Sequence, residues 1–532
     1  METTALYPVN ITSTDAKPTE SRTGKLAFLA GAGMLLSRIM GLVRQSIFSH
    51  YFGLSDAGDA FMQAFRIPNF LQNLFGEGVL SASFIPVYAN LLARREEKLS
   101  QEVAGAIAAI LGLVCSATVL VGMLATPLLI DIIAPGFHGA KRELTIQLVR
   151  ILFPGAGLLV MSAWCLGILN SHRKFFLSYT APVIWNVAMI ATLVWFGPRG
   201  SEVRLAAALA WGSVIGSALQ VLVQLPPVFR LLHRLPLSLG RGSGDVRTVV
   251  RNFGPVFVSR GVVQLSAFID LMIASWLPTG AVTAISNAQL LYTLPVSLFG
   301  MTVSAAELPA MSSLLGSDSE IAAQLRQRLN ASLQRIAFFT VPSAIAFLCL
   351  GDIIAAALLQ SGRFTAANST YVWEILAGSS VGLLASTMGR LYASTYYALK
   401  DTRTPLRFAV IRVALTTALG FLFALFVPRW LGLDPHLGAA GLTASAGVAG
   451  WVEFVLLRGG LNRRIGSTGI PVPVTARLWG AALLGAAAAW GVKLAIGHHH
   501  PIVMAAATLA PYGVVYIGGT YLMGIGFIRR KL

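Results

Sequence analysis

The chain has 532 residues, of which 55% are hydrophobic and only 12% are charged, and its mean hydropathy is +0.70. Soluble domains carry about 25% charged residues, so the composition excludes an ordinary soluble protein and indicates a polytopic helical membrane protein. The formal charge of +18 does not predict nucleic-acid binding, because the basic residues lie in short loops between apolar runs.

Residues 1–24 are rich in Thr, Ser and Pro and contain no apolar run, which predicts a disordered cytoplasmic tail and not a signal peptide. Fourteen apolar runs follow, each long enough to cross a bilayer. They predict an all-α polytopic membrane protein of about 14 transmembrane helices. The predicted spans are 26–51, 58–92, 103–133, 143–170, 175–196, 203–229, 249–277, 283–315, 330–358, 370–398, 406–427, 437–457, 474–496 and 502–527.

The charges of the loops predict the orientation of the spans. One set of alternate loops, together with both terminal segments, holds 26 Lys and Arg residues, whereas the opposite loops hold 7. Basic loops stay on the cytoplasmic side of a membrane. Both termini are therefore predicted to be cytoplasmic in a multi-pass membrane protein, which requires an even number of spans.

Several short motifs recur in the same order about 225 residues apart, which indicates an internal repeat. The pairs are Ser37-Arg38 with Ser259-Arg260, Leu74-Phe75-Gly76 with Leu298-Phe299-Gly300, Pro86 with Pro309, Gly136-Phe137 with Arg363-Phe364, and the basic turns at 170–173 and 400–403. Two lobes of six spans each are expected around a central site. The predicted units are a tail (1–24), an N-terminal lobe (25–230), a basic cytoplasmic linker (231–248), a C-terminal lobe (249–460) and two extra helices (461–532).

The first two spans carry charges at membrane depth, where charged side chains normally face a cavity or a partner. Arg38 and Arg44 lie in span one, and Asp59, Arg66 and Glu77 lie in span two. Asp59, Arg66 and Asn73 are seven residues apart, so they share one helix face. Three alternatives stay open. Arg44 can snorkel to the membrane surface, Arg38 can form a structural pair with Asp59 or Glu77, and the asparagines can serve helix packing.

The second lobe carries Arg260, Asp270, Glu307 and Arg390 at membrane depth. Arg260 is the repeat partner of Arg38, so both lobes can present a cation to the centre. A site rich in arginine suits an anionic, phosphate-bearing substrate. Asp270 and Glu307 are candidates for ion coupling, although pairing with Arg260 or Arg390 explains them equally well. No motif predicts catalysis, a metal site or a cofactor, so the chain is expected to be a transporter and not an enzyme.

The run from Ser37 to Tyr88, SRIMGLVRQSIFSHYFGLSDAGDAFMQAFRIPNFLQNLFGEGVLSASFIPVY, resembles the MurJ (MviN) lipid II flippases of the MATE-like exporter superfamily. APGF at 134–137, GILNSHRKF at 167–175, GRFTA at 362–366 and KDTRTP at 400–405 also resemble that family. The resemblance implies two six-helix lobes around a cationic cavity, and two extra helices lining a groove for the undecaprenyl tail. It also implies lipid II as the substrate, with membrane lipids and cell-wall synthesis proteins as further partners.

On this resemblance, Arg38, Arg44, Asp59 and Glu77 stand at functional positions of the family, and Arg66 stands at a basic one. The chain departs from the family pattern at Gln72-Asn73, where a basic pair is expected, and at Leu290, where an arginine is expected. Arg260 is a candidate replacement for that arginine. The substrate-binding set predicted from the sequence is Arg38, Arg44, Asp59, Arg66, Glu77 and Arg260.

The resemblance leads to a flippase that works by alternating access, driven by the membrane potential or an ion gradient. Two alternatives remain. A drug or cation antiporter of the same superfamily would place acids at the cavity centre, and a non-transporting scaffold for cell-wall synthesis would have lost transport together with the arginine expected at position 290.

Overall fold

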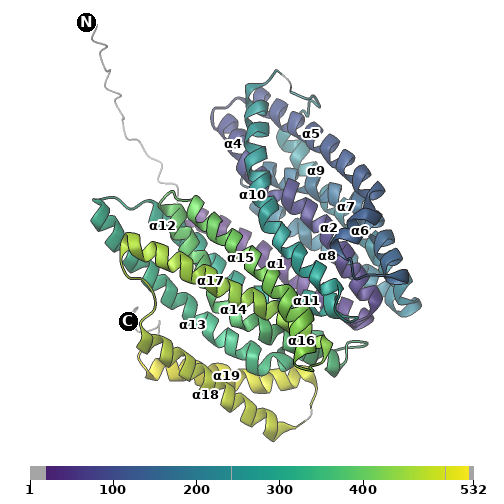
Figure 1. Ribbon diagram of the computed structural model, residues 1–532. Coiled ribbons are helices and arrows are strands. Elements are labelled where there is room, and N and C mark those ends of the chain that lie inside the picture. The colour runs from purple at the N-terminus through teal and green to yellow at the C-terminus, as the bar shows by residue number, and fades with distance from the viewer. Residues whose placement is uncertain (1–19, 241, 498, 526–532) are drawn as a thin grey trace.

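A computed structural model describes residues 20–240, 242–497 and 499–525, without the side chains of 20–31, 68, 77, 78, 255, 256 and 258–267. Within these ranges the chain is an assembly of long helices (Figure 1). We call α1–α9 the N-terminal lobe and α10–α17 the C-terminal lobe. The N-terminal lobe consists of α1 (Glu20–Phe52), α2 (Asp56–Phe75), α3 (Glu77–Ser83), α4 (Ile85–Ala93), α5 (Glu97–Leu124), α6 (Thr126–Ile133), α7 (Gly139–Ser171), α8 (Phe175–Phe196), η1 (Gly197–Arg199) and α9 (Glu202–Leu232).

The C-terminal lobe is followed by two further helices, which pack on α13. Its elements are α10 (Gly244–Ser275), α11 (Ala281–Pro295), η2 (Val296–Met301), α12 (Thr302–Ser312), α13 (Asp318–Leu359), α14 (Ala366–Ala398), α15 (Arg403–Phe421), η3 (Leu422–Phe426), α16 (Val427–Trp430), η4 (Pro435–Leu437) and α17 (Gly438–Ile465), and the two further helices are α18 (Val472–Ile496) and α19 (Pro501–Leu522).

Ten helical segments of the described chain are long and apolar enough to cross a membrane, which confirms a polytopic all-α membrane protein. The count of fourteen stays a prediction. The segments outside these ten are α1, the run from α2 to α4, the short α6, α10 and α14. Three of them have 32 or 33 residues, about 48–50 Å of helix, so they have the length of a span.

Loop side chains start several of the long helices. Ser55, Ser201, Ser243 and Thr365 each accept a hydrogen bond from a backbone amide in the first turn. Such caps satisfy amides that have no partner inside the helix. Helix α13 begins with a capping box at Ser317, whose amide donates to the Glu320 carboxylate at 2.9 Å and lowers the pKa of that carboxyl.

Three apolar clusters show where the lobes join. One cluster runs through both lobes and includes Phe48, Phe61, Leu271 and Phe364. A second belongs to the C-terminal lobe with α18 and α19, and a third belongs to the N-terminal lobe with the start of α10. The lobes therefore share a core at one end and have separate cores at the other, where α12 and α4 lie apart (Figure 1).

We call the joined end, with loops 53–55, 276–280 and 360–365, the closed end. The end with the loops between α4 and α5, α7 and α8, and α14 and α15 carries the basic residues, and we call it the basic end. Helix α10 runs between the two ends and packs on the N-terminal lobe, with Phe257 5.1 Å from Phe75 between ring centroids. The predicted domain boundary between residues 230 and 249 stays a prediction.

The internal repeat reappears as matching irregularities in the backbone. Helix α2 ends at Leu-Phe-Gly76, and α11 passes into the π-helical η2 at Leu-Phe-Gly300. Arg173 and Lys400 both have φ of 60° in the tight turns at the basic end. These two residues are 227 apart, as are Phe137 and Phe364, so the basic turns pair at 173 and 400. The pairing of 170 with 400 expected from the sequence is wrong by three residues, because the shared feature is the left-handed backbone position and not the letters around it.

Candidate functional site

The lobes meet at the closed end around the carboxylate of Asp59, which is only 1% exposed. Its Oδ1 accepts hydrogen bonds from the amide and the hydroxyl of Thr283, at 2.9 and 2.8 Å. Its Oδ2 accepts from the Gly280 amide at 2.7 Å. Asp59 belongs to α2 and its three donors lie at the start of α11, so an anion of one lobe caps a helix of the other. The positive end of a helix dipole favours such an anion.

Lys141 completes this contact. Its ammonium lies 2.8 Å from Asp59 Oδ2 and 2.9 Å from Asp56 Oδ1, and 4.4 Å from the centroid of the Phe137 ring. Asp56 in turn accepts a hydrogen bond from the Thr279 hydroxyl at 3.0 Å. Buried charges are tolerated when they are paired and hydrogen-bonded, and the two aspartates and the lysine meet that condition. We call Asp56, Asp59, Lys141, Thr279, Gly280 and Thr283 the closed-end latch.

Further bonds between the lobes lie beside the latch. Gln45 donates to Asn287 Oδ1 at 2.6 Å, and Asn287 donates to the Ser49 hydroxyl at 3.3 Å. The Gly136 amide donates to the Ser275 hydroxyl at 3.0 Å. A Cβ atom at Gly136 would lie 2.2 Å from the Ser275 carbonyl oxygen, so only glycine allows this approach. The closed end is therefore sealed by polar contacts between segments distant in sequence.

A polar cavity of about 380 Å³ lies between α1, α2, α10 and α11. It contains two of the predicted arginines, Arg44 and Arg66, and none of its lining residues is acidic. Amides and hydroxyls supply the rest of its polar surface. The lining residues are Arg44, Gln45, Met62, Phe65, Arg66, Asn69, Phe70, Asn73, Phe268, Leu271, Ser286, Gln289, Leu290 and Thr293.

Arg44 is held by aromatic rings in place of an acid. Its guanidinium carbon lies 5.3 Å from the ring centroids of both Phe65 and Trp185, whose planes differ by only 7°. Its Nη1 lies 3.9 Å from the Met189 sulfur. In the part of the chain whose side chains are described, no carboxylate lies within 4 Å of it. Arg44 therefore keeps its charge free for an anion that enters the cavity.

Arg66 faces Asp270 of α10 across the lobes, and the two side chains attract one another electrostatically without an ion pair within 4 Å. Arg412 of α15 attracts Asp270 as well. Asp270 Oδ1 is buried and has no hydrogen-bond partner among the described groups. This carboxylate therefore lies behind the cavity between cations of both lobes.

The other predicted residues whose side chains are described lie outside this cavity. Arg38 is exposed on α1, about 9 Å nearer the basic end than Arg44, and it does not line the cavity. Asp59 belongs to the latch. Glu307 lies 3.4 Å from Arg328 and accepts from Ser332 at 2.9 Å, so among the described side chains it pairs within its own lobe and not with the predicted Arg390. The side chains of Glu77 and Arg260 lie outside the described residues.

Sequence reasoning missed several residues of the site. Trp185 and Phe65, which hold Arg44, read in the sequence as ordinary apolar positions. Lys141 was counted only as a loop charge. The one available signal for Lys141 was its place four residues after the APGF motif.

A second arginine cluster lies in the C-terminal lobe. Arg412 pairs with Glu453 of α17 at 3.1 Å. Arg390 of α14 interacts electrostatically with both of them and with Tyr292, whose hydroxyl lies 2.7 Å from that of Ser386. These cations are partly neutralised, so they offer less free charge than Arg44. Among the described residues, no group of three or more His, Cys, Asp or Glu side chains could hold a metal ion.

The family model described as "Lipid II flippase MurJ" matches residues 48–509. The chain belongs to this family. It is 32% identical over 438 residues to the "Lipid II flippase MurJ" of Burkholderia cenocepacia, covering 81% of the chain and 82% of the relative. It is also 32% identical over 445 residues to the "Probable lipid II flippase MurJ" of Rhizobium tropici, covering 82% and 80%.

Solved structures support the same fold. The chain matches "Lipid II flippase MurJ, inward closed conformation" with a TM-score of 0.76 at 22% identity, covering 93% of this chain and 98% of that one. It matches an inward-facing MATE-family multidrug resistance transporter with a TM-score of 0.64 at 16% identity, covering 83% and 100%. The resemblance inferred from the sequence is thus confirmed at the level of family and fold.

Two positions at which the chain departs from the MurJ family pattern lie in the polar cavity. Leu290 and Asn73 line the cavity itself, so the cationic set is reduced where an anion would bind. The absence of acids among the lining residues also disfavours a cation antiporter, which would need them there.

Proposed function

We propose that the protein is a lipid II flippase of the bacterial inner membrane, which moves the undecaprenyl-pyrophosphate-linked precursor of peptidoglycan from the inner to the outer leaflet. The observation that carries the proposal is Arg44, a cation in the cavity between the lobes with aromatic contacts and no acidic partner within 4 Å among the described side chains. A pyrophosphate offers the oxygens that a guanidinium binds in pairs. Arg66 adds a second cation to the same cavity.

The basic end is proposed to be cytoplasmic, with both termini on that side, in accordance with the loop charges. The conformation described is then an inward-facing one, closed towards the outside by the latch. Substrate would enter between the lobes from the basic end, with Arg38 and Arg260 extending the cationic path. Release would require the latch to open and the lobes to approach one another at the basic end.

The membrane potential is proposed to drive export. The pyrophosphate carries about two negative charges, and each is worth about 2.3 kcal/mol per 100 mV. An inside-negative potential of that size favours outward movement by about 4–5 kcal/mol. Asp270, a buried acid between cations of both lobes, is the better placed of the two predicted ion-coupling residues, because Glu307 is engaged by Arg328 and Ser332.

Complementation tests the proposal. The chain is expressed in a bacterium depleted of its own lipid II flippase, and membrane levels are checked by immunoblot. The parent chain should restore growth and Arg44→Ala should not. Arg429→Ala removes an exposed arginine from α16 at the closed end and serves as the matched control, which should grow like the parent. Full growth with Arg44→Ala, or none with a well-expressed parent, would overturn the proposal.

A further inference from the structure

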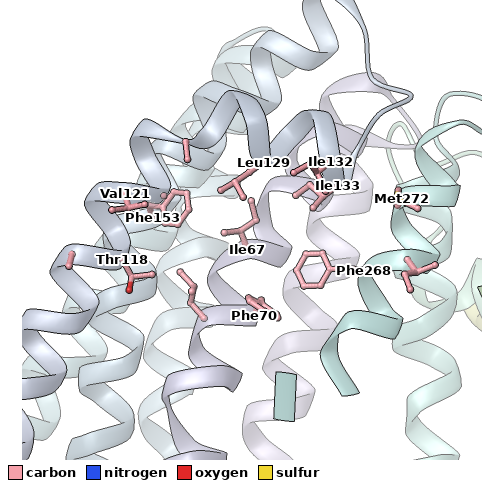
Figure 2. A pocket seen from close by; sticks show the side chains of 15 residues that line it. Ile67, Phe70, Thr118, Val121, Leu129, Ile132, Ile133, Phe153, Phe268 and Met272 are labelled. Atoms are coloured by element: carbon pink, nitrogen blue, oxygen red, sulfur yellow. The ribbon is translucent and has the colours of Figure 1, made fainter. Parts of the chain in front are cut away.

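An apolar cavity of about 670 Å³ lies beside the polar one, between α2, α5, α6, α7 and α10 (Figure 2). Fifteen residues line it, and Thr118 carries their only hydroxyl, which already donates to the Val114 carbonyl at 2.8 Å. Small residues, Gly122 and Ala125 among them, leave the space. Its volume is in the range of ligand sites, roughly 300–1,000 Å³. Apart from the acceptor lone pairs of that hydroxyl, the lining side chains offer no partner for a polar group, so the chemistry of the cavity suits a hydrocarbon chain.

Two phenylalanines separate this cavity from the polar one. Phe70 of α2 and Phe268 of α10 line both spaces, and their rings meet edge to face with centroids 4.9 Å apart. Figure 2 shows Phe268 directed from α10 towards Ile67 and Phe70. Helix α10 packs on the N-terminal lobe along its first half and on α15 at its end, where the ring centroids of Trp276 and Phe421 lie 5.5 Å apart. The ring pair lies between these two regions, where α10 passes from one lobe to the other. A movement of the lobes that parts these rings would join the two spaces.

The cavity is also reachable from the bilayer. Val121 and Ile132 line it and are 63% and 57% exposed. Phe268 lies seven residues, about 10 Å, from the last residue of α10 at the closed end. The opening therefore faces the hydrocarbon of the leaflet on the closed-end side, which is the outer leaflet in the proposed orientation.

The other boundary between the lobes has the opposite character. There α1 and α11 are joined by the hydrogen bonds of Gln45, Ser49 and Asn287. The two boundaries correspond under the internal repeat, which pairs α1 with α10 and α2 with α11. Among the described side chains no hydrogen bond joins α2 to α10, where Arg66 and Asp270 attract one another without an ion pair within 4 Å. A hydrocarbon chain can therefore pass beside Phe70 and Phe268 without breaking a buried hydrogen bond between these two helices.

We propose that the apolar cavity binds the part of the polyprenyl chain nearest the pyrophosphate, and that Phe70 and Phe268 form the gate through which this chain passes to the outer leaflet. The inference rests on the proposed function. An amphiphile whose anionic group lies against Arg44 and Arg66 needs an apolar space next to the polar one. The cavity behind Phe70 adjoins the polar space directly.

Filling the cavity tests this assignment. Ala117→Trp places a large ring in it, and Leu120→Trp places the same ring on the exposed side of the same helix as a matched control. Binding is measured with full-length protein for lipid II and for a short-chain analogue with the same headgroup. Ala117→Trp should weaken lipid II binding at least tenfold and leave the analogue unchanged, whereas Leu120→Trp should change neither. Unchanged lipid II binding in folded Ala117→Trp protein would overturn the inference.

Two further measurements distinguish failure of this inference from failure of the proposed function. Arg44→Ala should weaken both ligands, and if it weakens neither, the proposed function fails and not only the inference. Replacing Thr118 by the photo-cross-linking residue p-benzoyl-phenylalanine avoids dependence on the tryptophan variant. Labelled lipid II should be captured there and competed by unlabelled lipid II. Equal capture of phospholipid acyl chains with and without lipid II would mean that the cavity holds bilayer lipid, and the inference would be wrong.

Discussion

The Asp59→Asn substitution should weaken the closed end without unfolding the protein. The amide oxygen of asparagine can still accept from the Thr283 amide and hydroxyl, as Oδ1 does now. The amide nitrogen replaces Oδ2 and then faces two donors, the Gly280 amide and the Lys141 ammonium. Both charge-assisted bonds are lost, and each is worth about 1.5–3 kcal/mol.

The two bonds together are worth about 3–6 kcal/mol, and removal of one partner of a buried ion pair typically costs about 3–5 kcal/mol, so we expect a loss of about 3–5 kcal/mol. Asp59 bonds to Gly280 and Thr283 only while the closed end is shut, and the bond of Lys141 to Asp59 connects two helices of the N-terminal lobe. Part of the lost free energy is therefore lost in both conformations and does not shift the equilibrium between them. Even a differential of about 2.8 kcal/mol shifts the equilibrium towards the open state about 100-fold.

Distance measurements between spin labels can check this prediction. Labels at Arg199 and Leu433 report on closed-end loops of the two lobes, and labels at Lys98 and Leu315 report on the basic end. Asp59→Asn should lengthen the first distance and shorten the second. Asp131→Asn is the control, because Asp131 pairs with Arg142 at the same end, at 2.7 and 3.1 Å, but within one lobe. Equal shifts in both variants, or none in Asp59→Asn, would refute the role assigned to the latch.

Three further predictions concern the cavity and a turn at the basic end. Arg44→Lys keeps the charge but loses the planar contact with its aromatic neighbours. Transport of fluorescent lipid II in proteoliposomes should therefore fall about 10–100-fold, the equivalent of one charge-assisted hydrogen bond. Unchanged transport would contradict the role assigned to Arg44. Leu290→Arg should tighten lipid II binding about tenfold or more, whereas a rise in transport from near zero would favour the scaffold alternative. Hydrogen bonds from the Thr404 amide and hydroxyl lower the pKa of Asp401 to about 2, so this carboxylate stabilises its turn above about pH 4 and loses the effect as the pH falls towards 2. Asp401→Asn should therefore reduce hydrogen-exchange protection of the Thr404 amide at pH 7. Equal protection in parent and variant would argue against this role of Asp401.

Much of the fold could be predicted from the sequence because its signals are local. An apolar run predicts a membrane span without information about neighbouring segments, and the charge of a loop predicts the side of the membrane on which the loop lies. The cationic cavity was partly predictable for the same reason, since Arg44 and Arg66 are conspicuous inside apolar helices. Two of the segments left outside the ten apolar ones, α1 and the run from α2 to α4, are those that carry these charges.

The role of Asp59 could not be predicted, because its partners are far away in the sequence. Lys141 is 82 residues from it, and Gly280 and Thr283 are 221 and 224 residues away. Spacing along α2 places Asp59 on the same face as Arg66, which suggested a shared cavity. In the structure this face of α2 instead has two different surroundings at different depths: Asp59 contacts the other lobe at the closed end, whereas Arg66 lines the polar cavity between the lobes.

Two kinds of contact between the lobes, directional polar bonds and a shared apolar core, explain how the protein can change conformation without losing its fold. At the closed end, the latch and the Gln45–Asn287 contact are directional bonds that exist in one arrangement only. The shared apolar core around Phe48, Phe61 and Leu271 is not directional, so lobes that rotate about it keep much of its burial. The directional bonds then decide which state is populated, and the apolar core holds the lobes together in both. A substitution in the latch should consequently change conformation, whereas Phe61→Ala in the shared core should lower stability by about 3–5 kcal/mol and leave the balance between the two states largely as it was.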